Sequence, residues 1–259
     1  MATELHAITF RALDPAAQAR FWAELLGWRR VDDAGDGLAL EVGDAAYGDT
    51  APDGGDRPAY RLRFVPSDRP KVTANRMHFD LTSGYPDEQA ESVARAISLG
   101  AKHIDVGQTP EEGHTVLADP EGNEVDVLPA ERGTFMKETG FTGALACDGS
   151  EAVGRFWSAA LDWPLVWDQD EETAIQSPRG GTKINWGGPP YDPQARPNRL
   201  HFDLAPSAGS TLDREVERLL ALGATMADED AGVEPCAPGW AVMLDPDGTE
   251  FCVMPMGSA

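Results

Sequence analysis

The chain has 259 residues, of which 44 are acidic and 21 are basic, so its formal net charge at pH 7 is −23. This charge argues against binding to nucleic acid or to anionic membranes, because both would repel the protein. The hydrophobic content of 41% is that of a globular protein, no apolar run approaches the roughly 18 residues of a membrane span, and the length favours two domains.

The first 65 residues are predicted to form a strand, a helix and three further strands. Alternating apolar residues predict the first strand at 5–10. Asp14 and Pro15 are typical of the start of a helix, and an apolar stripe extends that helix to residue 26. A loop rich in Gly, Asp and Pro is predicted at 43–58. The three further strands are predicted at 28–31, 38–42 and 60–65.

Residues 76–128 repeat this order of elements. A strand is predicted at 76–82 and a helix at 87–99. The inward face of that helix is predicted to consist of Ala90, Val93, Ala94 and Ile97. The remaining strands are predicted at 102–106, 115–118 and 124–128.

One seven-residue phrase occurs twice in the chain. Residues 75–81 read Asn-Arg-Met-His-Phe-Asp-Leu, and residues 198–204 differ from them only by Leu for Met. In a strand, His78 and Asp80 share one face, while the apolar residues between them share the other. An imidazole beside a carboxylate is an unusual pair to point into a fold, so we expect function to lie on that face.

Other segments recur with the same order. Residues 20–22 match 155–157, and the Asp-Pro-x-Gly turn at 119–122 returns at 245–248. Such internal similarity indicates duplication. The sequence therefore predicts an α+β fold with four βαβββ modules in two domains, at residues 1–130 and 139–257.

The three cysteines are odd in number and widely spaced. Cys147, Cys236 and Cys252 form no Cys-x-x-Cys pair, which argues against a disulfide framework and a zinc-thiolate knuckle and favours a reducing compartment. Cys252 lies between two apolar residues and is expected to be a core thiol. The N-terminus has neither a basic nor an apolar leader region, so a cytoplasmic location is expected.

The helix ending Phe-Trp-x-x-x-Leu-Gly-Trp at 21–28, the His-bearing strand and the Asp-Pro-x-Gly strand together resemble the vicinal oxygen chelate superfamily. This superfamily includes glyoxalase I, extradiol dioxygenases, fosfomycin-resistance enzymes and bleomycin-binding proteins. The resemblance covers nearly the whole chain, twice. It implies glyoxalase-like domains in which paired βαβββ modules curl as mixed sheets around a cup that holds one divalent metal ion. Members with one domain often pair to complete their cups, and two domains can do so within one chain.

The resemblance also assigns candidate metal ligands. His78 and His201 take the family's mid-domain ligand position, and Asp126 takes the closing carboxylate position, which Cys252 occupies in the second domain. The first-strand ligand position falls on Ala7, and His6 reaches the cup only through a bulge, because a one-residue offset reverses the side chain. In the second domain that position falls on residues 141–143, none of them a good ligand. The predicted metal site is His6, His78 and Asp126.

Candidate acid–base residues are found in each domain near the positions that the resemblance assigns to metal ligands. Glu124 and Glu250 lie two residues before the closing positions and share their face. The predicted catalytic residues are His78, Glu124, His201 and Glu250.

Three interpretations of His78 and His201 stay open. They can form a buried polar network that fixes strand pairing, they can bind metal, or they can transfer protons without metal. Arg11 and Arg63 are expected in surface ion pairs or against an anionic group. Trp186 and Trp240 are expected in ordinary packing or in the wall of a ligand pocket.

The leading functional hypothesis is a small-molecule enzyme, a lyase, isomerase or dioxygenase, acting on an oxygenated metabolite. It would use one divalent ion (zinc, iron, manganese or nickel) or none. The alternative is a non-catalytic protein of the bleomycin-binding type that holds a drug or cationic metabolite in an acidic cup. A third hypothesis makes one domain functional and the other structural. The expected partner is a small molecule, with neither nucleic acid nor membrane, and the chain is expected to be a monomer or a homodimer.

Overall fold

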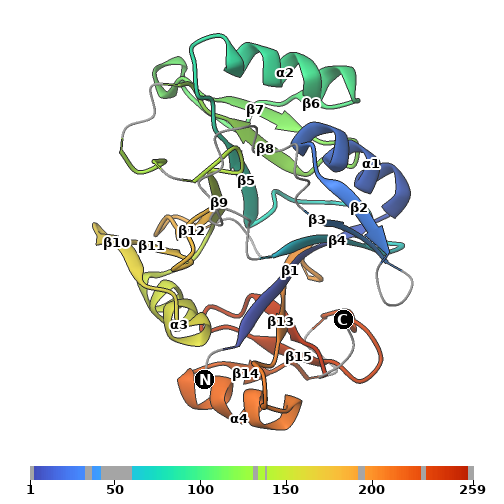
Figure 1. Ribbon diagram of the computed structural model, residues 1–259, viewed down its shortest axis with the longest axis vertical. Coiled ribbons are helices and arrows are strands. Elements are labelled where there is room, and N and C mark those ends of the chain that lie inside the picture. Colours follow the sequence, from blue (N-terminus) through green and yellow to red (C-terminus); the bar gives the residue numbers. More distant parts are fainter. Residues whose placement is uncertain are drawn as a thin grey trace.

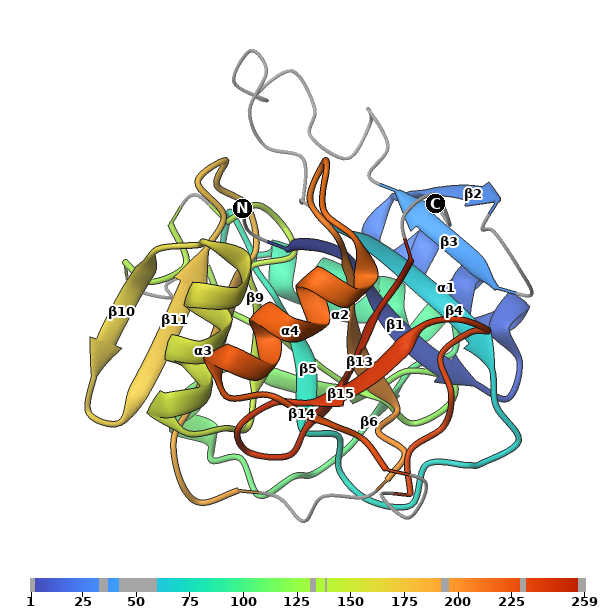
Figure 2. The same ribbon diagram turned by 90° about the horizontal axis from the view of Figure 1, so that it is seen from below.

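The structure is a computed structural model, and it describes residues 3–32, 37–41, 60–130, 134–137, 139–191, 196–228 and 232–255. The predicted loop at 43–58 lies outside these residues. The described chain forms two eight-stranded mixed sheets and four α-helices (Figures 1 and 2). None of these helices combines the length and the hydropathy that crossing a bilayer requires.

The first sheet combines four strands from each end of the chain, in the order β14-β15-β16-β13-β1-β4-β3-β2. The strands from the N-terminal half are β1 (Glu4–Ala12), β2 (Arg29–Asp32), β3 (Leu38–Glu41) and β4 (Arg61–Pro66). The strands from the C-terminal half are β13 (Leu200–Ala205), β14 (Thr225–Met226), β15 (Ala241–Leu244) and β16 (Glu250–Val253).

The second sheet is built from the middle of the chain, in the order β10-β11-β12-β9-β5-β8-β7-β6. Its strands from the N-terminal half are β5 (Met77–Leu81), β6 (Lys102–His103), β7 (Thr115–Ala118) and β8 (Glu124–Val127). Its strands from the C-terminal half are β9 (Ala144–Cys147), β10 (Leu165–Gln169), β11 (Glu172–Gln176) and β12 (Lys183–Trp186).

In each sheet, antiparallel pairing therefore joins strands from the two halves of the chain. Blue β1 lies antiparallel to orange β13, and green β5 lies antiparallel to β9 (Figure 1). The predicted α+β fold with four βαβββ modules is confirmed. The predicted ranges 1–130 and 139–257 each supply half of both sheets, and the repeated phrase forms a central strand in each.

The helices begin and end largely where the sequence predicts. The Asp14 side chain accepts a hydrogen bond of 2.9 Å from the Ala17 amide, and Gly27 ends the first helix with a φ of 69°, a conformation that favours glycine. Helices α3 and α4 lie side by side in Figure 2. The bounds are α1 (Pro15–Leu26), α2 (Glu88–Ser98), α3 (Glu151–Leu161) and α4 (Leu212–Leu222), and a 3₁₀ turn spans Pro110–Glu112.

Two predicted details are wrong. The strand expected at 102–106 pairs only over Lys102–His103. On α2 the buried residues are Ser92 and Ala96, whereas Ile97 is 38% exposed. Of the predicted face only Val93 packs against the core, while Ala90 and Ala94 are exposed. Neighbouring positions on a helix point about 100° apart, so the predicted face is rotated from the one that packs, which includes the polar residue Ser92.

One continuous core joins the two sheets. The Trp22 ring of α1 lies 5.2 Å from Phe10 of β1 and 5.7 Å from Phe79 of β5, measured between ring centroids. These contacts bring the apolar faces of both sheets together. Trp22 and its counterpart Trp157 in the second half of the chain are both fully buried.

Two equivalent hydrogen bonds connect helices α1 and α3 to turns of the sheets on which they do not pack. Trp22 Nε1 donates to Asp119 Oδ2 at 3.1 Å, and Trp157 Nε1 donates to Asp245 Oδ2 at 3.3 Å. Helix α1 packs on the first sheet while Asp119 belongs to the second, and α3 and Asp245 reverse this relation. The recurring Phe-Trp and Asp-Pro-x-Gly segments are thus partners in space.

Burial raises the pKa of Asp245 to about 6 although three hydrogen bonds favour its charged form. An aspartate in the unfolded chain has a pKa near 3.9, so between pH ~4 and pH ~6 the native state binds a proton that the unfolded state does not. The contribution of Asp245 to the unfolding free energy therefore falls by about 3 kcal/mol as pH rises through that window. We expect Asp245→Asn to lose this pH dependence. Urea unfolding of both proteins between pH 4 and pH 7 checks it; a constant difference between the two curves would contradict it.

Candidate functional site

Alternate residues of the central strands form one polar face on each sheet. In the first sheet Thr9 lies opposite His201, and in the second Ala146 lies opposite His78. We call the first group the His201 face, which comprises Thr9, Arg11, Arg63, His201, Asp203 and Glu250. We call the second group the His78 face, which comprises His78, Asp80, Asp126, Ala144, Ala146 and Asn185.

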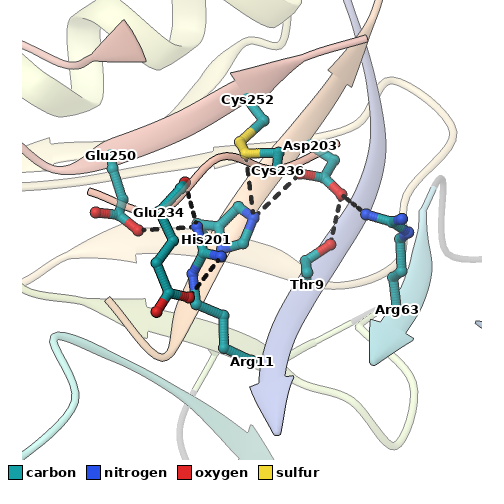
Figure 3. The surroundings of a disulfide bond; sticks show 9 residues. All are labelled: Thr9, Arg11, Arg63, His201, Asp203, Glu234, Cys236, Glu250 and Cys252. Carbon is teal, nitrogen blue, oxygen red and sulfur yellow. Dashed lines mark hydrogen bonds and ion pairs between the residues drawn. A yellow bond between two sulfur atoms is a disulfide. The ribbon is translucent and has the colours of Figure 1, made fainter. Parts of the chain in front are cut away.

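Asp203 is the centre of the His201 face (Figure 3). It lies 3.3 Å from His201 Nε2, accepts a hydrogen bond of 2.5 Å from Thr9 Oγ1, and lies 3.5 Å from Arg63 Nη1. Burial alone would raise the pKa of Asp203, but the hydrogen bonds and charges of these partners outweigh it and lower that pKa. Asp203 is therefore a buried carboxylate held in its ionised form.

A second set of ion pairs fills the same face beside Asp203. Arg11 lies 3.2 Å from Glu234 and 3.4 Å from Glu250, and it is 3% exposed. Burial raises the pKa of Glu250, and its electrostatic interactions with His201 and Arg11 only partly offset this effect. The expectation of surface ion pairs for Arg11 and Arg63 is wrong, because both guanidinium groups are buried.

A disulfide joins Cys236 to Cys252 across this face, with their Cα atoms 6.4 Å apart (Figure 3). The expectation that these two cysteines stay unpaired is therefore wrong. The argument from free thiols to a reducing compartment no longer holds. Cys252 occupies the closing ligand position on β16, while Cys236 comes from the segment before β15. The sulfur of Cys236 also lies 3.8 Å from His201 Nε2.

The His201 face is consequently closed by the protein itself. His201 is 1% exposed and Asp203 is fully buried. The segment that carries Glu234 and Cys236 also carries Trp240, whose ring lies 5.1 Å from the Arg63 guanidinium. His201, Asp203, Cys236 and Cys252 place possible metal-ligand atoms within 4.8 Å of one another, but the disulfide withdraws both sulfurs from such a role. Trp186, by contrast, belongs to the core.

The His78 face is more open and more acidic. His78 Nε2 lies 3.5 Å from Asp80 Oδ1 and 3.8 Å from Asp126 Oδ2. The side chain of His78 is 31% exposed, and those of Asp80 and Asp126 are 15% and 14% exposed. The ligand atoms of all three residues lie within 4.8 Å of one another, so this group could hold a metal ion.

Electrostatic interactions within this group shift the pKa values of His78 and Asp126. Burial lowers the pKa of His78, but the hydrogen bond to Asp80 and the charges of Asp80, Asp126 and Glu124 outweigh it and raise that pKa to about 9. Burial raises the pKa of Asp126 to about 6, against the opposing charge of His78. The carboxylates of this face therefore attract cations, and they stabilise the protonated form of His78.

His114 joins this group and was not predicted. Its Nε2 lies 3.6 Å from Asp126 Oδ2 and 3.7 Å from Glu112. His114 directly precedes β7, in which Val116 pairs with Asp126. Since residues two apart share a face, pairing the strands through the Asp-Pro-Glu-Gly-Asn turn would have placed His114 beside Asp126.

Two other predicted site residues are held by partners other than His78 or belong to the other sheet. Glu124 forms an ion pair with Lys71 and accepts a hydrogen bond of 3.2 Å from the Asn75 amide. His6 lies on β1 in the first sheet, where the pairing with β13 shifts register between Leu5 and Ala7. The bulge at His6 thus exists, but it belongs to the sheet of His201, and the structure does not bring His6 to His78.

The wall opposite His78 is built from small and unsatisfied groups. The strand register continues from His78 through Ala146, Asn185 and Ala174 to Trp167. Asn185 Oδ1 accepts no hydrogen bond and Trp167 Nε1 donates none, although both atoms are buried. Thr9 and Arg63 occupy the equivalent positions of Ala146 and Asn185 on the His201 face, where they bond to Asp203.

Comparison with protein families identifies both halves of the chain. A model of the glyoxalase-like domain matches residues 7–128 and 143–254. None of the curated proteins compared with the sequence matches it.

Solved structures resemble the chain over nearly its whole length. Glyoxalase I from Zea mays superposes with a TM-score of 0.61 and 12% sequence identity, covering 97% of this chain and 92% of its own. A putative dioxygenase from Bacillus subtilis superposes with a TM-score of 0.52 and 14% identity, covering 98% of this chain and 86% of its own. At these identities the likeness establishes the fold, and the chemistry must be argued from the site.

The disulfide makes a prediction about stability. Cys236 and Cys252 are separated by 16 residues, and closing a loop of that size stabilises a native state by about 3 kcal/mol. We expect a reducing agent to lower the melting temperature of the protein and to leave that of Cys236→Ser unchanged. Calorimetry with and without reductant measures both; a melting temperature of the unaltered protein that ignores reductant would contradict the pairing.

Proposed function

The chain belongs to the glyoxalase-like domain family, and from that premise we propose that it is a small-molecule enzyme whose active site is the His78 face. One observation carries the proposal: His78 Nε2 lies 3.5 and 3.8 Å from two carboxylates in a group that remains partly exposed. On the His201 face the equivalent histidine is buried beneath ion pairs of the protein itself.

The donor set of the His78 face fits a divalent ion. Zinc and its neighbours hold nitrogen and oxygen ligands at about 2.0–2.2 Å, so two atoms on one ion lie at most about 4.4 Å apart. His78 meets this limit with both Asp80 and Asp126, and His114 adds a second imidazole 3.6 Å from Asp126. One imidazole or two with two carboxylates suits zinc, iron, manganese or nickel.

The residues around this donor set support an oxygenated substrate. When bound, a divalent ion acts as a Lewis acid on a substrate oxygen. Trp167 Nε1 offers a donor and Asn185 Oδ1 an acceptor on the same row of the sheet, and neither atom has a hydrogen-bond partner in the part of the chain that the structure describes. A small molecule that carries both a hydroxyl and a carbonyl group would satisfy them and be oriented against His78.

A metal-free binding protein is the second candidate. The family resemblance places the first-strand ligand of the second domain at residues 141–143, none of them a good ligand, and on β9 the polar face presents Ala144 and Ala146. Asp80, Asp126, Glu112 and Glu124 would then attract a cationic small molecule. Metal stoichiometry separates the two candidates.

We further propose that the chain acts without a second copy. Each sheet already takes strands from both halves of one chain, so neither polar face needs a partner subunit to complete it. A homodimer remains compatible with this arrangement. Location in the cytoplasm stays a prediction.

The metal hypothesis predicts about one divalent ion per chain. We expect His78→Ala to lose that ion, because it removes the central ligand atom of the group, and His103→Ala, which changes an exposed histidine of the same sheet, to keep it. Elemental analysis of untagged protein, purified without chelator and supplied with zinc, iron, manganese or nickel, gives the stoichiometry. Absence of metal from the unaltered protein would leave the binding candidate.

Asymmetry between the two faces predicts a different outcome for the other histidine. His201→Gln disturbs the buried group around Asp203, so we expect the unfolding free energy to fall by about 3 kcal/mol. The metal content should stay that of the unaltered protein. Denaturant unfolding and elemental analysis on the same sample measure both quantities, and metal loss with unchanged stability would place the site at His201 instead.

A further inference from the structure

The segments that lead into the two copies of the repeated phrase enclose a cavity of about 280 Å³. It is separate from the proposed active site, since neither His78, Asp80, Asp126 nor His114 lines it. Its walls come mainly from Ser67, residues 69–77 and residues 196–200, with contributions from Arg11 and Thr249.

Basic side chains are concentrated around this cavity, and most of them form ion pairs with carboxylates that lie outside its lining. Six of the 21 basic residues of the chain line it, and none of its described lining residues is acidic. The formal net charge of the whole chain is −23. The basic lining residues are Arg11, Arg69, Lys71, Arg76, Arg196 and Arg199.

Three of these guanidinium groups keep an unused donor. The Nε atoms of Arg11, Arg76 and Arg199 are buried and donate no hydrogen bond to any of the described residues. Their side chains are 3%, 9% and 8% exposed. A buried donor without an acceptor is costly, so these atoms point to a ligand that accepts hydrogen bonds.

Carboxylates behind the cavity wall fix the positions of these cations. Arg199 forms an ion pair with Glu121, and Arg76 Nε lies 3.7 Å from Asp148 Oδ2, beyond hydrogen-bond distance. The Arg76 guanidinium also lies 5.7 Å from the Tyr191 ring centroid. Because an arginine carries five donors, an ion pair on one side leaves others for a ligand.

The repeated phrase accounts for the symmetry of the site. Asn75 and Arg76 line the cavity from one half of the chain, and Asn198 and Arg199 line it from the other. Met77 and Leu200, the position at which the two phrases differ, add apolar walls. The phrase thus presents His and Asp to the polar faces and Asn and Arg to the cavity.

We propose that this cavity is a second binding site, which takes a small organic oxyanion with an apolar body. Carboxylate and phosphate groups match the planar donor fork of arginine, and the apolar walls match a hydrocarbon or aromatic portion. The site does not depend on the activity proposed for the His78 face.

Three probes of similar shape test the proposal by isothermal titration calorimetry. We expect benzoate or phenyl phosphate to bind saturably at one site per chain, more weakly as sodium chloride increases, and benzamidine, a cation of similar shape, to give no such binding. Comparison of the two anions shows whether the site prefers carboxylate or phosphate. Failure of both anions to bind in the millimolar range, or equal binding of benzamidine, would overturn the proposal.

Variants locate the binding. Arg76→Gln should weaken the anion about tenfold or more, and Ala74→Trp, which fills the cavity from an exposed position, should abolish binding without a change of charge. Arg155→Gln removes a charge that is 50% exposed and outside the cavity, so its affinity should match that of the unaltered protein. Equal weakening by Arg155→Gln, or no effect of Ala74→Trp, would contradict the site. Metal content at the His78 face should stay the same in all three variants.

Discussion

Antiparallel pairing between the two halves of the chain is the constraint on which the rest of the structure depends. Strand β1 pairs with β13 and β5 with β9, and these ladders put the repeated phrase at the centre of each sheet. The register fixes which side chains meet His78 and His201. A shift by one residue would turn both histidines into the apolar core that joins the sheets.

The duplicated scaffold holds two different chemistries because a few facing positions differ. On one face Thr9 donates a hydrogen bond to Asp203 and Arg63 forms an ion pair with it, whereas Ala146 and Asn185 occupy the equivalent positions beside His78. At the closing position one strand carries Asp126, and the other carries Cys252, which is tied to Cys236. One face is therefore a buried polar network, and the other holds partly exposed carboxylates around an imidazole.

Local patterns predicted the elements, because helix caps and strand alternation are written in neighbouring residues. Asp14 and the recurring Phe-Trp and Asp-Pro-x-Gly segments are examples, and the two copies of the phrase revealed the duplication. The sites required knowledge of contacts between distant residues. Cys236 lies in a segment without periodicity, so its contact with Cys252 left no local signal, and His114 required the register of β7 against β8.

The polar side chains around His78 are the proposed active site. A crystal structure of the protein grown with zinc, with diffraction data collected on both sides of the zinc absorption edge, locates the ion directly. The account predicts one anomalous peak among His78, Asp80 and Asp126, within reach of His114. A peak among the residues around His201, or an unliganded His78 in crystals whose zinc occupies other sites, would contradict it.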